Sequence, residues 1–516
     1  MTEYRTLLRR QRAYYQSGRT RSYGSRMKSL DRMYCWIEVH EKEIEEALRA
    51  DLGKAAFEAY ATEIGIVKEE IRFHQKHLRR YMKIKKVKTP VTQFPASSFI
   101  YPEPYGVVLI MSPWNYPFQL TIAPLAAALA AGNCAIVKPS AYAACTSELL
   151  KQMIGELFPK AYVCAVTGGR AENEMLLEEK FDYIFFTGSS SVGRYVMEKA
   201  ARHLTPVSLE LGGKSPCIVE ESADIRLAAR RIVWGKFLNA GQTCVAPDYL
   251  LVHHKIKDKL VTAICSEIKR AYGANPLESS DYPHIINEKH FKRLCGLLRE
   301  GRLLTGGEVR EKTLQIAPAL VDQVSWDAAV MQEEIFGPIL PIITFYDMKE
   351  VIDSVRSRPK PLALYLFTRK RSVEKEILQN LSFGGGCIND TVVHLATSHL
   401  PFGGVGESGM GSYHGQAGFD TFTHKKSIMK KSLIVDVPAV SYTHLKIFFC
   451  QFFKFRKCID NCFVSNTISN TNISGTAKGS SRHDQNIIFF CSAAEFCFIF
   501  SWCFHKQIKS PLRFHT

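Results

Sequence analysis

The chain has 516 residues, of which 46% are hydrophobic and 23% are charged, and its formal net charge is +17. This composition excludes a collagen-like or wholly disordered chain, and 15 cysteines in a chain of this length exclude a small disulfide scaffold. The length suits two or three domains, and the first residues contain no apolar run of signal-peptide length, so we expect a cytoplasmic protein with free thiols.

The charge is divided unevenly near residue 440. Beyond that position, nine Lys or Arg residues stand against three Asp or Glu residues, so the last 76 residues contribute +6 and the first 440 contribute +11. The same 76 residues hold six of the 15 cysteines and 13 of the 31 phenylalanines. The chain therefore has a body of ordinary composition and a C-terminal tail of a different composition.

Apolar residues before position 100 recur at steps of three and four, which predicts amphipathic helices. The recurring positions are Leu30, Tyr34, Ile37, Ile44 and Leu48, followed by Val67, Ile71, His74 and Leu78. The run KIKKVK at 83–88 is a cluster of positive charge without interleaved aromatic residues. We interpret it as a solvated helix end or strand edge, and we expect no nucleic-acid partner.

From Gly106 the pattern changes to short apolar runs that alternate with helical segments. The run GVVLIMS at 106–112 predicts a strand buried on both faces, and the next segment, 118–131, predicts a helix that ends at Gly132-Asn133. Further strands are expected at 135–137, 162–166 and 183–186, and further helices at 146–157 and 191–201. Strands joined by crossover helices predict a parallel, doubly wound sheet that binds ligands at the carboxyl ends of its strands.

A second α/β region is predicted from about residue 216 to about residue 401. Its expected strands are 216–219, 249–253, 339–345 and 362–367, and its expected helices are 224–238, 256–271, 287–299 and 372–380. A glycine-rich segment, PFGGVGESGMGSYHG, follows at 401–415.

Polar segments follow three expected strands of the first region. They are SPWNYP at 112–117, KPS at 138–140 and TGSSSVG at 187–193. The last segment would bring backbone N–H groups to a phosphate at a helix N-terminus, but the usual GxGxxG pattern is missing. Taken alone, such a segment is more often an ordinary turn, and for Lys138 alone a surface ion pair is the favoured interpretation.

Two further segments, VSLELGGKSP at 207–216 and NAGQTCVAP at 239–247, carry candidate chemistry. Alone, Cys244 fits a small buried hydrophobe and Glu210 fits an exposed carboxylate. Together the segments supply a nucleophile, a base, glycine-rich backbone and amide donors, which covalent catalysis at a carbonyl carbon requires. We predict no metal site.

Seven motifs in the chain occur in the order found in the NAD(P)-dependent aldehyde dehydrogenase superfamily. They are PWNYP, VKPS, FTGS, LELGGKSP, GQTC, EEIFGP and PFGG. The chain resembles this superfamily over roughly residues 1–439. The PDY that follows GQTC and the segment GMGSYHG resemble its class 3 branch of fatty and aromatic aldehyde dehydrogenases.

The resemblance implies an aldehyde dehydrogenase-like α/β fold with two doubly wound domains and a β dimerisation arm. The implied parts are a Rossmann-like NAD(P)-binding domain at 1–84 and 102–210, a catalytic domain at 211–400, a return to the cofactor domain at 401–410, and the arm at 85–101 and 411–436. A homodimer is expected.

The resemblance also implies oxidation of an aldehyde to a carboxylic acid through a covalent thioester. Cys244 would be the nucleophile, and the Asn115 side chain and the Cys244 N–H would stabilise the oxyanion. Glu210 would activate water to hydrolyse the thioester, so we expect burial to raise its pKa. NAD or NADP would be held by Lys138, Gly188, Ser189, Glu334 and Phe336, with Asn389 in a supporting role.

Two other functions remain open. An acylating relative would release the thioester to coenzyme A, but Glu210 argues against this because it supplies a hydrolytic base. A non-catalytic binding protein would be expected to lack part of the set of Cys244, Asn115 and Glu210, all of which are present. The identity of the aldehyde does not follow from the sequence.

Two departures from the family pattern carry predictions. Many relatives have Glu directly after KPS, where a carboxylate would repel a 2′-phosphate; Ala141 stands there and predicts use of both NAD and NADP. The tail at 440–516 shows no helix or strand period, and we interpret it as disordered or non-native sequence. A weak membrane anchor at 487–504 is disfavoured because Glu495 lies within it and its length is near the minimum span.

Overall fold

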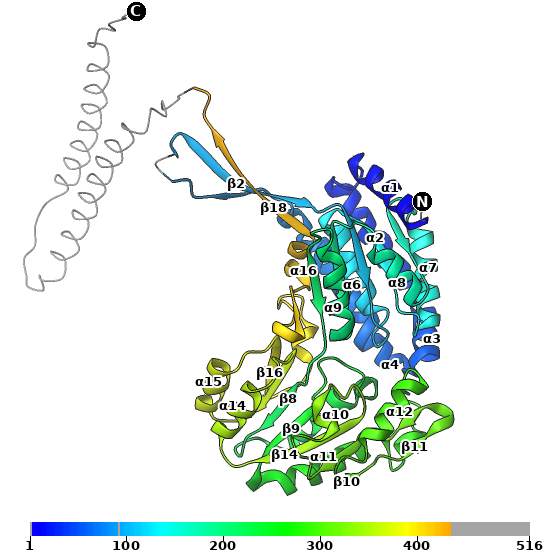
Figure 1. Cartoon of the computed structure of the whole chain (residues 1–516), viewed down its shortest axis with the longest axis vertical. Coiled ribbons are helices and arrows are strands. Elements are labelled where there is room, and N and C mark those ends of the chain that lie inside the picture. The colour runs from blue at the N-terminus through cyan, green and yellow to red at the C-terminus, as the bar shows by residue number, and fades with distance from the viewer. Residues whose placement is uncertain (1–2, 91–92, 435–516) are drawn as a thin grey trace, which may run out of the picture. The chain divides into compact units, whose positions relative to one another are not determined.

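The computed structural model describes residues 3–90 and 93–434 (Figure 1). The tail from residue 440, with the segment 487–504, lies outside the described residues, as do the last two positions of the expected arm. Within the described ranges, no helix combines the length and apolarity needed to cross a bilayer. The nine cysteines in these ranges are free thiols.

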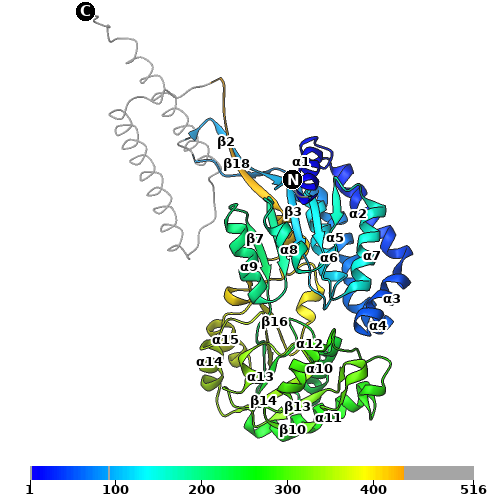
Figure 2. The same cartoon turned by 45° about the vertical axis from the view of Figure 1, so that its right-hand side comes forward.

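The first α/β region contains a six-stranded sheet in the order β17-β7-β6-β3-β4-β5. Its strands are β3 (Val107–Met111), β4 (Cys134–Lys138), β5 (Val163–Ala165), β6 (Tyr183–Thr187), β7 (Val207–Glu210) and β17 (Gly409–Met410). They pair in parallel, except that β17 runs antiparallel to β7. Strands β3, β4 and β6 are buried along their whole length, because helices cover both faces of the sheet (Figure 2).

Helix α6 (Gln119–Ala131) lies at the centre of this region. Its sequence is apolar on almost every side, and all of its residues are buried. It packs against β3 and β4 on one side and against α2 and α5 on the other. The other helical elements of the region are α1 (Glu3–Gln16), α2 (Tyr23–Val39), α3 (Glu41–Leu52), α4 (Ala56–Ala59), the π-helix η1 (Tyr60–Ile64), α5 (Gly65–Tyr81), α7 (Ala144–Leu157), α8 (Arg170–Leu177), α9 (Ser190–Ala201), η8 (Gly406–Ser408) and α16 (Gly415–Thr421).

The second α/β region contains a seven-stranded sheet in the order β10-β13-β14-β9-β8-β15-β16. Its strands are β8 (Pro216–Val219), β9 (Tyr249–His253), β10 (Arg302–Thr305), β13 (Ala319–Asp322), β14 (Ile339–Phe345), β15 (Ala363–Phe367) and β16 (Gly385–Ile388). Only β10 pairs in antiparallel fashion within this sheet.

Helices and short strands complete the second region. They are α10 (Ile225–Phe237), η3 (Leu238–Gly241), η4 (His254–Ile256), α11 (Lys257–Tyr272), η5 (Pro276–Glu278), α12 (Glu288–Leu297), β11 (Val309–Arg310), η6 (Glu311–Thr313), β12 (Gln315–Ile316), α13 (Ala329–Gln332), α14 (Met348–Arg356), α15 (Arg371–Asn380) and η7 (Val393–Ala396). The fold class predicted from the sequence is confirmed. The apolar pattern missed β10, β13 and β16, because these four-residue strands are short or, in β16, begin with two glycines.

A three-stranded antiparallel sheet extends from the first region. Strand β2 (Ala96–Pro104) lies between β1 (Lys85–Val87) and β18 (Thr423–Lys431). Strands β2 and β18 pair along nine residues (Figure 1). The KIKKVK run forms the edge strand β1, whose three residues are exposed, so the interpretation as a solvated strand edge holds.

The C-terminal end of α6 generates a stability prediction. Gly132 has φ of 95°, and a Cβ there would lie 2.7 Å from the Arg26 guanidinium carbon. That guanidinium is buried and donates from Nη1 to the Ala130 carbonyl, 3.1 Å away. Gly132→Ala should therefore destabilise the fold by about 1–3 kcal/mol, measured by urea unfolding.

Gly155 is the matched control for this prediction. It lies within α7, and a Cβ there would meet no atom within 4 Å. Gly155→Ala should stabilise the fold by about 0.5–1 kcal/mol, because alanine loses less backbone entropy in a helix. Equal effects from the two substitutions would contradict the steric account of Gly132.

Candidate active site

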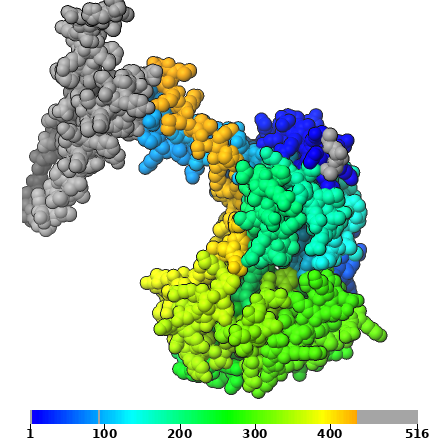
Figure 3. Space-filling model, in the orientation of Figure 1, coloured from blue at the N-terminus to red at the C-terminus, as the bar shows by residue number. Residues whose placement is uncertain are grey.

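A cavity of about 830 Å³ lies where the two α/β regions meet, and residues of both regions line it (Figure 3). The first region contributes the loops that follow β3, β6 and β7. The second contributes the loop before β9, part of α12, and the segment that precedes β14. Because these loops stand mainly at the carboxyl ends of parallel strands, the cavity lies where such folds bind ligands.

Cys244 lines this cavity in a loop with unusual backbone geometry. Earlier in this loop, three consecutive residues adopt left-handed conformations: Asn239, Ala240 and Gly241 have φ of 52°, 50° and 74°. Glycine is required at 241, since a Cβ there would lie 2.3 Å from the Gly337 carbonyl oxygen. The loop is therefore held in a shape that its own sequence does not favour.

The side chain of Gln242 fixes the nucleophile loop from inside. Its Nε2 donates to the carbonyls of Asn239 at 3.1 Å and His284 at 3.0 Å, and its Oε1 accepts from Ile286 N at 3.0 Å. Such a fully bonded buried amide has one stable orientation. On the C-terminal side of Cys244, the Tyr365 hydroxyl donates to the Val245 carbonyl at 2.5 Å.

Asn115 follows β3 and lines the same cavity. Its side chain is buried, and Nδ2 donates to the Gln242 carbonyl at 2.9 Å. An amide NH₂ carries two hydrogens, so this bond leaves the second for a ligand. The Asn115 carbonyl in turn accepts from Asn239 Nδ2 at 2.8 Å. Two loops from different regions are thus joined beside Cys244.

Glu210 ends β7 and projects into the cavity. It is 2% exposed, and neither of its carboxyl oxygens has a hydrogen-bond partner among the described residues. Burial therefore raises the pKa of Glu210 well above its usual range, in the direction expected from the sequence. Burial also raises the pKa of the Cys244 thiol, and the nearby carboxyls of Glu334 and Glu210 raise it further.

The residues expected to hold a dinucleotide fall into two groups. Gly188 and Ser189, at the N-terminus of α9, line the cavity, as do Glu334 and Phe336. The Glu334 carboxyl lies over Gly212, where a Cβ would be 1.8 Å from Oε2. Burial raises the pKa of Glu334 well above its usual range.

Lys138 and Asn389 lie apart from the residues that line the cavity. Lys138 Nζ donates to the Gly168 carbonyl at 2.7 Å, which links the carboxyl ends of β4 and β5. Asn389 bonds through both side-chain atoms to the backbone of Thr368, at 2.9 Å each. These two hydrogen bonds join β16 to β15.

Sequence reasoning missed the ion pair of Lys214 and Asp248, whose side-chain atoms are 2.6 Å apart. Lys214 Nζ also donates to the carbonyls of Val330 and Glu333, at 2.7 and 3.0 Å, and Asp248 Oδ1 accepts from Ile335 N at 3.1 Å. The pair thereby fixes the segment that carries Glu334. Both residues stand in quoted motifs, LELGGKSP and PDY, but their pairing leaves no mark in the sequence.

Comparison with known proteins finds similarity over most of the chain. A family model described as "Aldehyde dehydrogenase family" matches residues 3–428. The 4,4′-diaponeurosporen-aldehyde dehydrogenase of Staphylococcus aureus (strain NCTC 8325 / PS 47) is 49% identical, over 82% of this chain and 92% of that protein. Aldehyde dehydrogenase family 3 member B1 of Mus musculus is 45% identical, over 84% of this chain and 92% of that protein.

A solved structure is also similar. The structure titled "Substrate bound state of Staphylococcus Aureus AldH" superimposes with a TM-score of 0.86 at 46% identity, and covers 88% of this chain and 100% of that chain. The similarity therefore extends over both α/β regions and the sheet that extends from the first.

The electrostatics of the cavity generate a prediction about Cys244. In the protein without cofactor, the rate at which iodoacetamide alkylates Cys244 should keep rising up to a higher pH than the rate for the exposed Cys35. Burial and nearby carboxyls disfavour the Cys244 thiolate, which is the reactive form. Mass spectrometry of both sites between about pH 6 and 10 would measure this. Glu334→Gln removes a negative charge and should lower the Cys244 pKa. Coinciding pH profiles for Cys244 and Cys35 would contradict the account.

Proposed function

This chain belongs to the aldehyde dehydrogenase family, and we propose that it oxidises aldehydes to carboxylic acids through a covalent intermediate on Cys244. One observation carries the proposal: Cys244 and Asn115 from two loops and Glu210 from the end of β7 line one cavity. A nucleophile, an amide donor and a buried base in one site are the groups that acyl chemistry at a carbonyl carbon requires.

The cavity has features that fit a dinucleotide. Gly188 to Ser191 bring the N-terminus of α9, a helix of 12 residues, to one wall, where its N–H groups and dipole favour a phosphate. Glu334, a buried carboxyl, supplies an acceptor for sugar hydroxyls, and Phe336 adds an aromatic ring. These residues would hold NAD(P)⁺, which accepts the hydride when bound.

The first step is attack by the Cys244 sulfur on the aldehyde carbon. The thiol must first lose its proton to solvent, and Glu210, a carboxyl that lines the cavity, would assist by relaying this proton through water. The aldehyde oxygen then becomes an oxyanion. The second hydrogen of Asn115 Nδ2 and the Cys244 N–H would stabilise it, and each such donor contributes about 10²–10³-fold in rate.

The second step is hydrolysis of the thioester that remains after hydride loss. Glu210 takes a proton from water, which then attacks the thioester carbon and releases the carboxylic acid and the Cys244 thiol. A carboxyl with a raised pKa is a stronger base than an exposed one. Because Glu210 must be deprotonated, the rate of this step should fall as the pH drops through its raised pKa.

The lining of the cavity supports an apolar aldehyde. Its hydrophobic side chains include Ile66, Leu120, Trp234, Leu238, Val393 and Leu395. A polar aldehyde would lose its hydration against such a wall without gaining hydrogen bonds. Aromatic and medium- to long-chain aliphatic aldehydes are therefore the proposed substrates. NADH formation across an aldehyde chain-length series that includes benzaldehyde would rank them.

We also propose a cytoplasmic homodimer assembled through the three-stranded sheet. Exposed apolar side chains on it, among them Val87, Tyr101 and Met429, support an interaction surface on this sheet. Strands β2 and β18 hold each other in register over nine residue pairs, so the sheet is a defined element that a second copy can contact.

Both nucleotides are proposed as cofactors. Ala141 is exposed beside the carboxyl end of β4, and without a carboxylate at this position a 2′-phosphate meets no local repulsion. The specificity ratio of kcat/KM for NAD over NADP is then expected to stay below about a hundredfold.

The role of Glu210 generates a kinetic prediction. Glu210→Gln keeps the shape of the side chain and removes the base, so one equivalent of NADH should form rapidly while steady-state turnover falls by about 10²-fold or more. Cys244→Ala is the control and should lose both the burst and the turnover. Unchanged turnover of Glu210→Gln would contradict the assignment, and turnover that appears only with coenzyme A would point to an acylating enzyme.

The cofactor proposal generates a second prediction. Ala141→Glu should lower kcat/KM for NADP by about tenfold or more while kcat/KM for NAD changes by less than about threefold, because the new carboxylate repels the 2′-phosphate. Ala13→Glu adds the same charge at an exposed position of α1 and should change neither value. Parallel loss with both nucleotides would show that residue 141 does not approach the ribose.

A further inference from the structure

An ion pair with no solvent exposure lies beside the cavity. Lys54 Nζ and Glu63 Oε1 are 2.5 Å apart, and both side chains are 0% exposed. They belong to the segment between α3 and α5, nearly two hundred residues before Cys244 in the chain. Neither residue lines the cavity. Fully buried Lys and Glu are rare in proteins, so the pair calls for an explanation.

Lys54 contacts the loop that carries the oxyanion donor. Its Nζ donates to the Asn115 carbonyl at 3.0 Å and lies 4.0 Å from the centre of the Tyr116 ring. The Tyr116 hydroxyl bonds to Thr243 Oγ1 at 2.6 Å, and Thr243 directly precedes Cys244. The ammonium group thus holds the backbone of Asn115 and the ring beside it.

Glu63 holds the other end of the same loop. Its Oε2 accepts hydrogen bonds from the backbone N–H groups of Phe118 at 2.9 Å and Gln119 at 3.1 Å. These N–H groups stand at the start of α6 and have no acceptor within the helix itself, so they favour a negative charge. Residues 115–119 are therefore clamped between an ammonium group at one end and a carboxylate at the other.

The same segment also contacts the nucleophile loop. Glu58 Oε1 accepts from Asn239 N at 2.7 Å, at the first of the three left-handed residues that precede Gln242. Asn239 Nδ2 donates to the Asn115 carbonyl, which is also the acceptor of Lys54. One segment of 11 residues, from Lys54 to Ile64, thus reaches both loops that supply the oxyanion donors.

We propose that Lys54 and Glu63 are positioning residues for the oxyanion site: they fix the backbone of residues 115–119 so that the Asn115 amide meets the oxyanion. This inference rests on the proposed role of Asn115. A misplacement of about 1 Å at a reacting group can cost about 10²-fold in rate, so a rigid anchor for this loop has catalytic value.

Stability alone does not explain the pair. Taking two charges out of water costs free energy, and replacing a buried ion pair by apolar side chains of similar volume is often neutral or stabilising. Glu63 also lies in the π-helix η1, a rare turn that occurs often at functional sites. The contacts of the pair with residues 115–119 supply a reason for its presence that stability does not.

The test removes both charges together, so that no unpaired ion stays buried. In Lys54→Met/Glu63→Gln, the single-turnover rate of NADH formation from bound aldehyde should fall about tenfold or more. The dissociation constant of NAD, measured by protein fluorescence, should change by less than about twofold, because neither residue lines the cavity. Lys54→Leu/Glu63→Gln, which also leaves no unpaired ion, is the second variant and should show the same pattern if the first double variant folds poorly.

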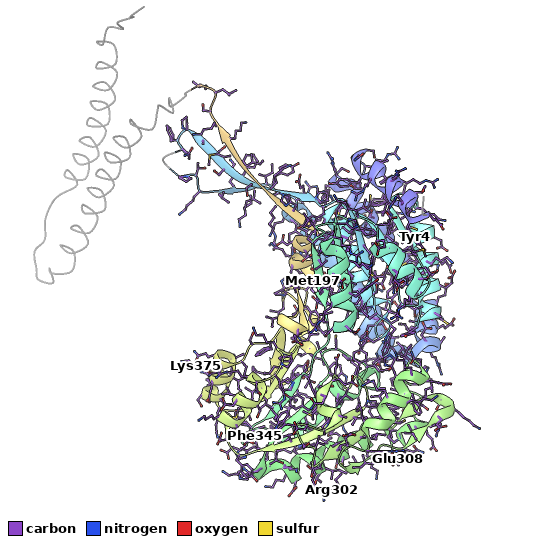
Figure 4. All side chains as sticks on the ribbon, viewed as in Figure 1. Tyr4, Met197, Arg302, Glu308, Phe345 and Lys375 are labelled. Atoms are coloured by element: carbon purple, nitrogen blue, oxygen red, sulfur yellow. The ribbon has the colours of Figure 1, made fainter. Side chains whose placement is uncertain are left out.

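A matched control is the pair Lys257 and Asp322, with Nζ and Oδ1 2.7 Å apart. It lies in the second region outside the cavity, and Asp322 also pairs with Arg302, which Figure 4 places on the side of that region away from the first. Lys257→Met/Asp322→Asn should leave the single-turnover rate unchanged even where the melting temperature falls. An equal fall in rate for this control would overturn the proposal.

A double-mutant cycle with Asn115→Ala separates the two proposals. If Lys54 and Glu63 act through Asn115, their substitution should cost little further rate once Asn115 is gone. An undiminished single-turnover rate in Asn115→Ala would reject the oxyanion role itself. The third outcome is a slow Asn115→Ala variant in which substitution of Lys54 and Glu63 lowers the single-turnover rate by the same factor as in the wild type. That outcome would keep the oxyanion role and reject positioning by Lys54 and Glu63.

Discussion

The hydrogen bond from Asn115 Nδ2 to the Gln242 carbonyl is the contact on which the proposed chemistry depends. Asn115 belongs to the first α/β region and Gln242 to the second, so this bond joins the amide donor to the nucleophile loop. Neither loop has regular secondary structure at this point. Each loop therefore needs hydrogen-bond partners outside itself, and those partners determine how precisely the groups beside Cys244 are positioned.

Burial sets the charge state of the site. Glu210 and Glu334 are both buried, and their pKa values are raised in consequence. Their presence also disfavours the thiolate of Cys244, in the same direction as the burial of that thiol. Lys236, fully buried without a hydrogen-bond partner among the described residues, has a pKa lowered by burial to about 8. Glu210 and Glu334 line the cavity, and carboxyl groups with raised pKa values are suited to proton transfer near neutral pH.

The sequence allowed much of this to be predicted, for identifiable reasons. Strands β8, β9 and β14 were predicted to the residue because buried parallel strands form continuous apolar runs. The loops of Cys244, Glu210 and Asn115 were predicted because their motifs keep a fixed order. The contact of Lys54 with Asn115 could not be predicted, because local sequence gives no sign that a Lys and a Glu nine positions apart are buried. For Asn389, motif position suggested a supporting role, but its two hydrogen bonds to Thr368 could not be predicted from the sequence.

Two Lys–carboxylate pairs fix the backbones of two different loops that line the cavity. Lys54 donates to the Asn115 carbonyl while Glu63 accepts from Phe118 N, and Lys214 donates to the Glu333 carbonyl while Asp248 accepts from Ile335 N. An ammonium group has three donors and a carboxylate has several acceptor positions, so a pair can bind both kinds of backbone group in a loop at once. A loop fixed in this way needs neither helix nor strand. The residues it presents, Asn115 on one side and Glu334 on the other, can then face the cavity without being part of the framework that holds them.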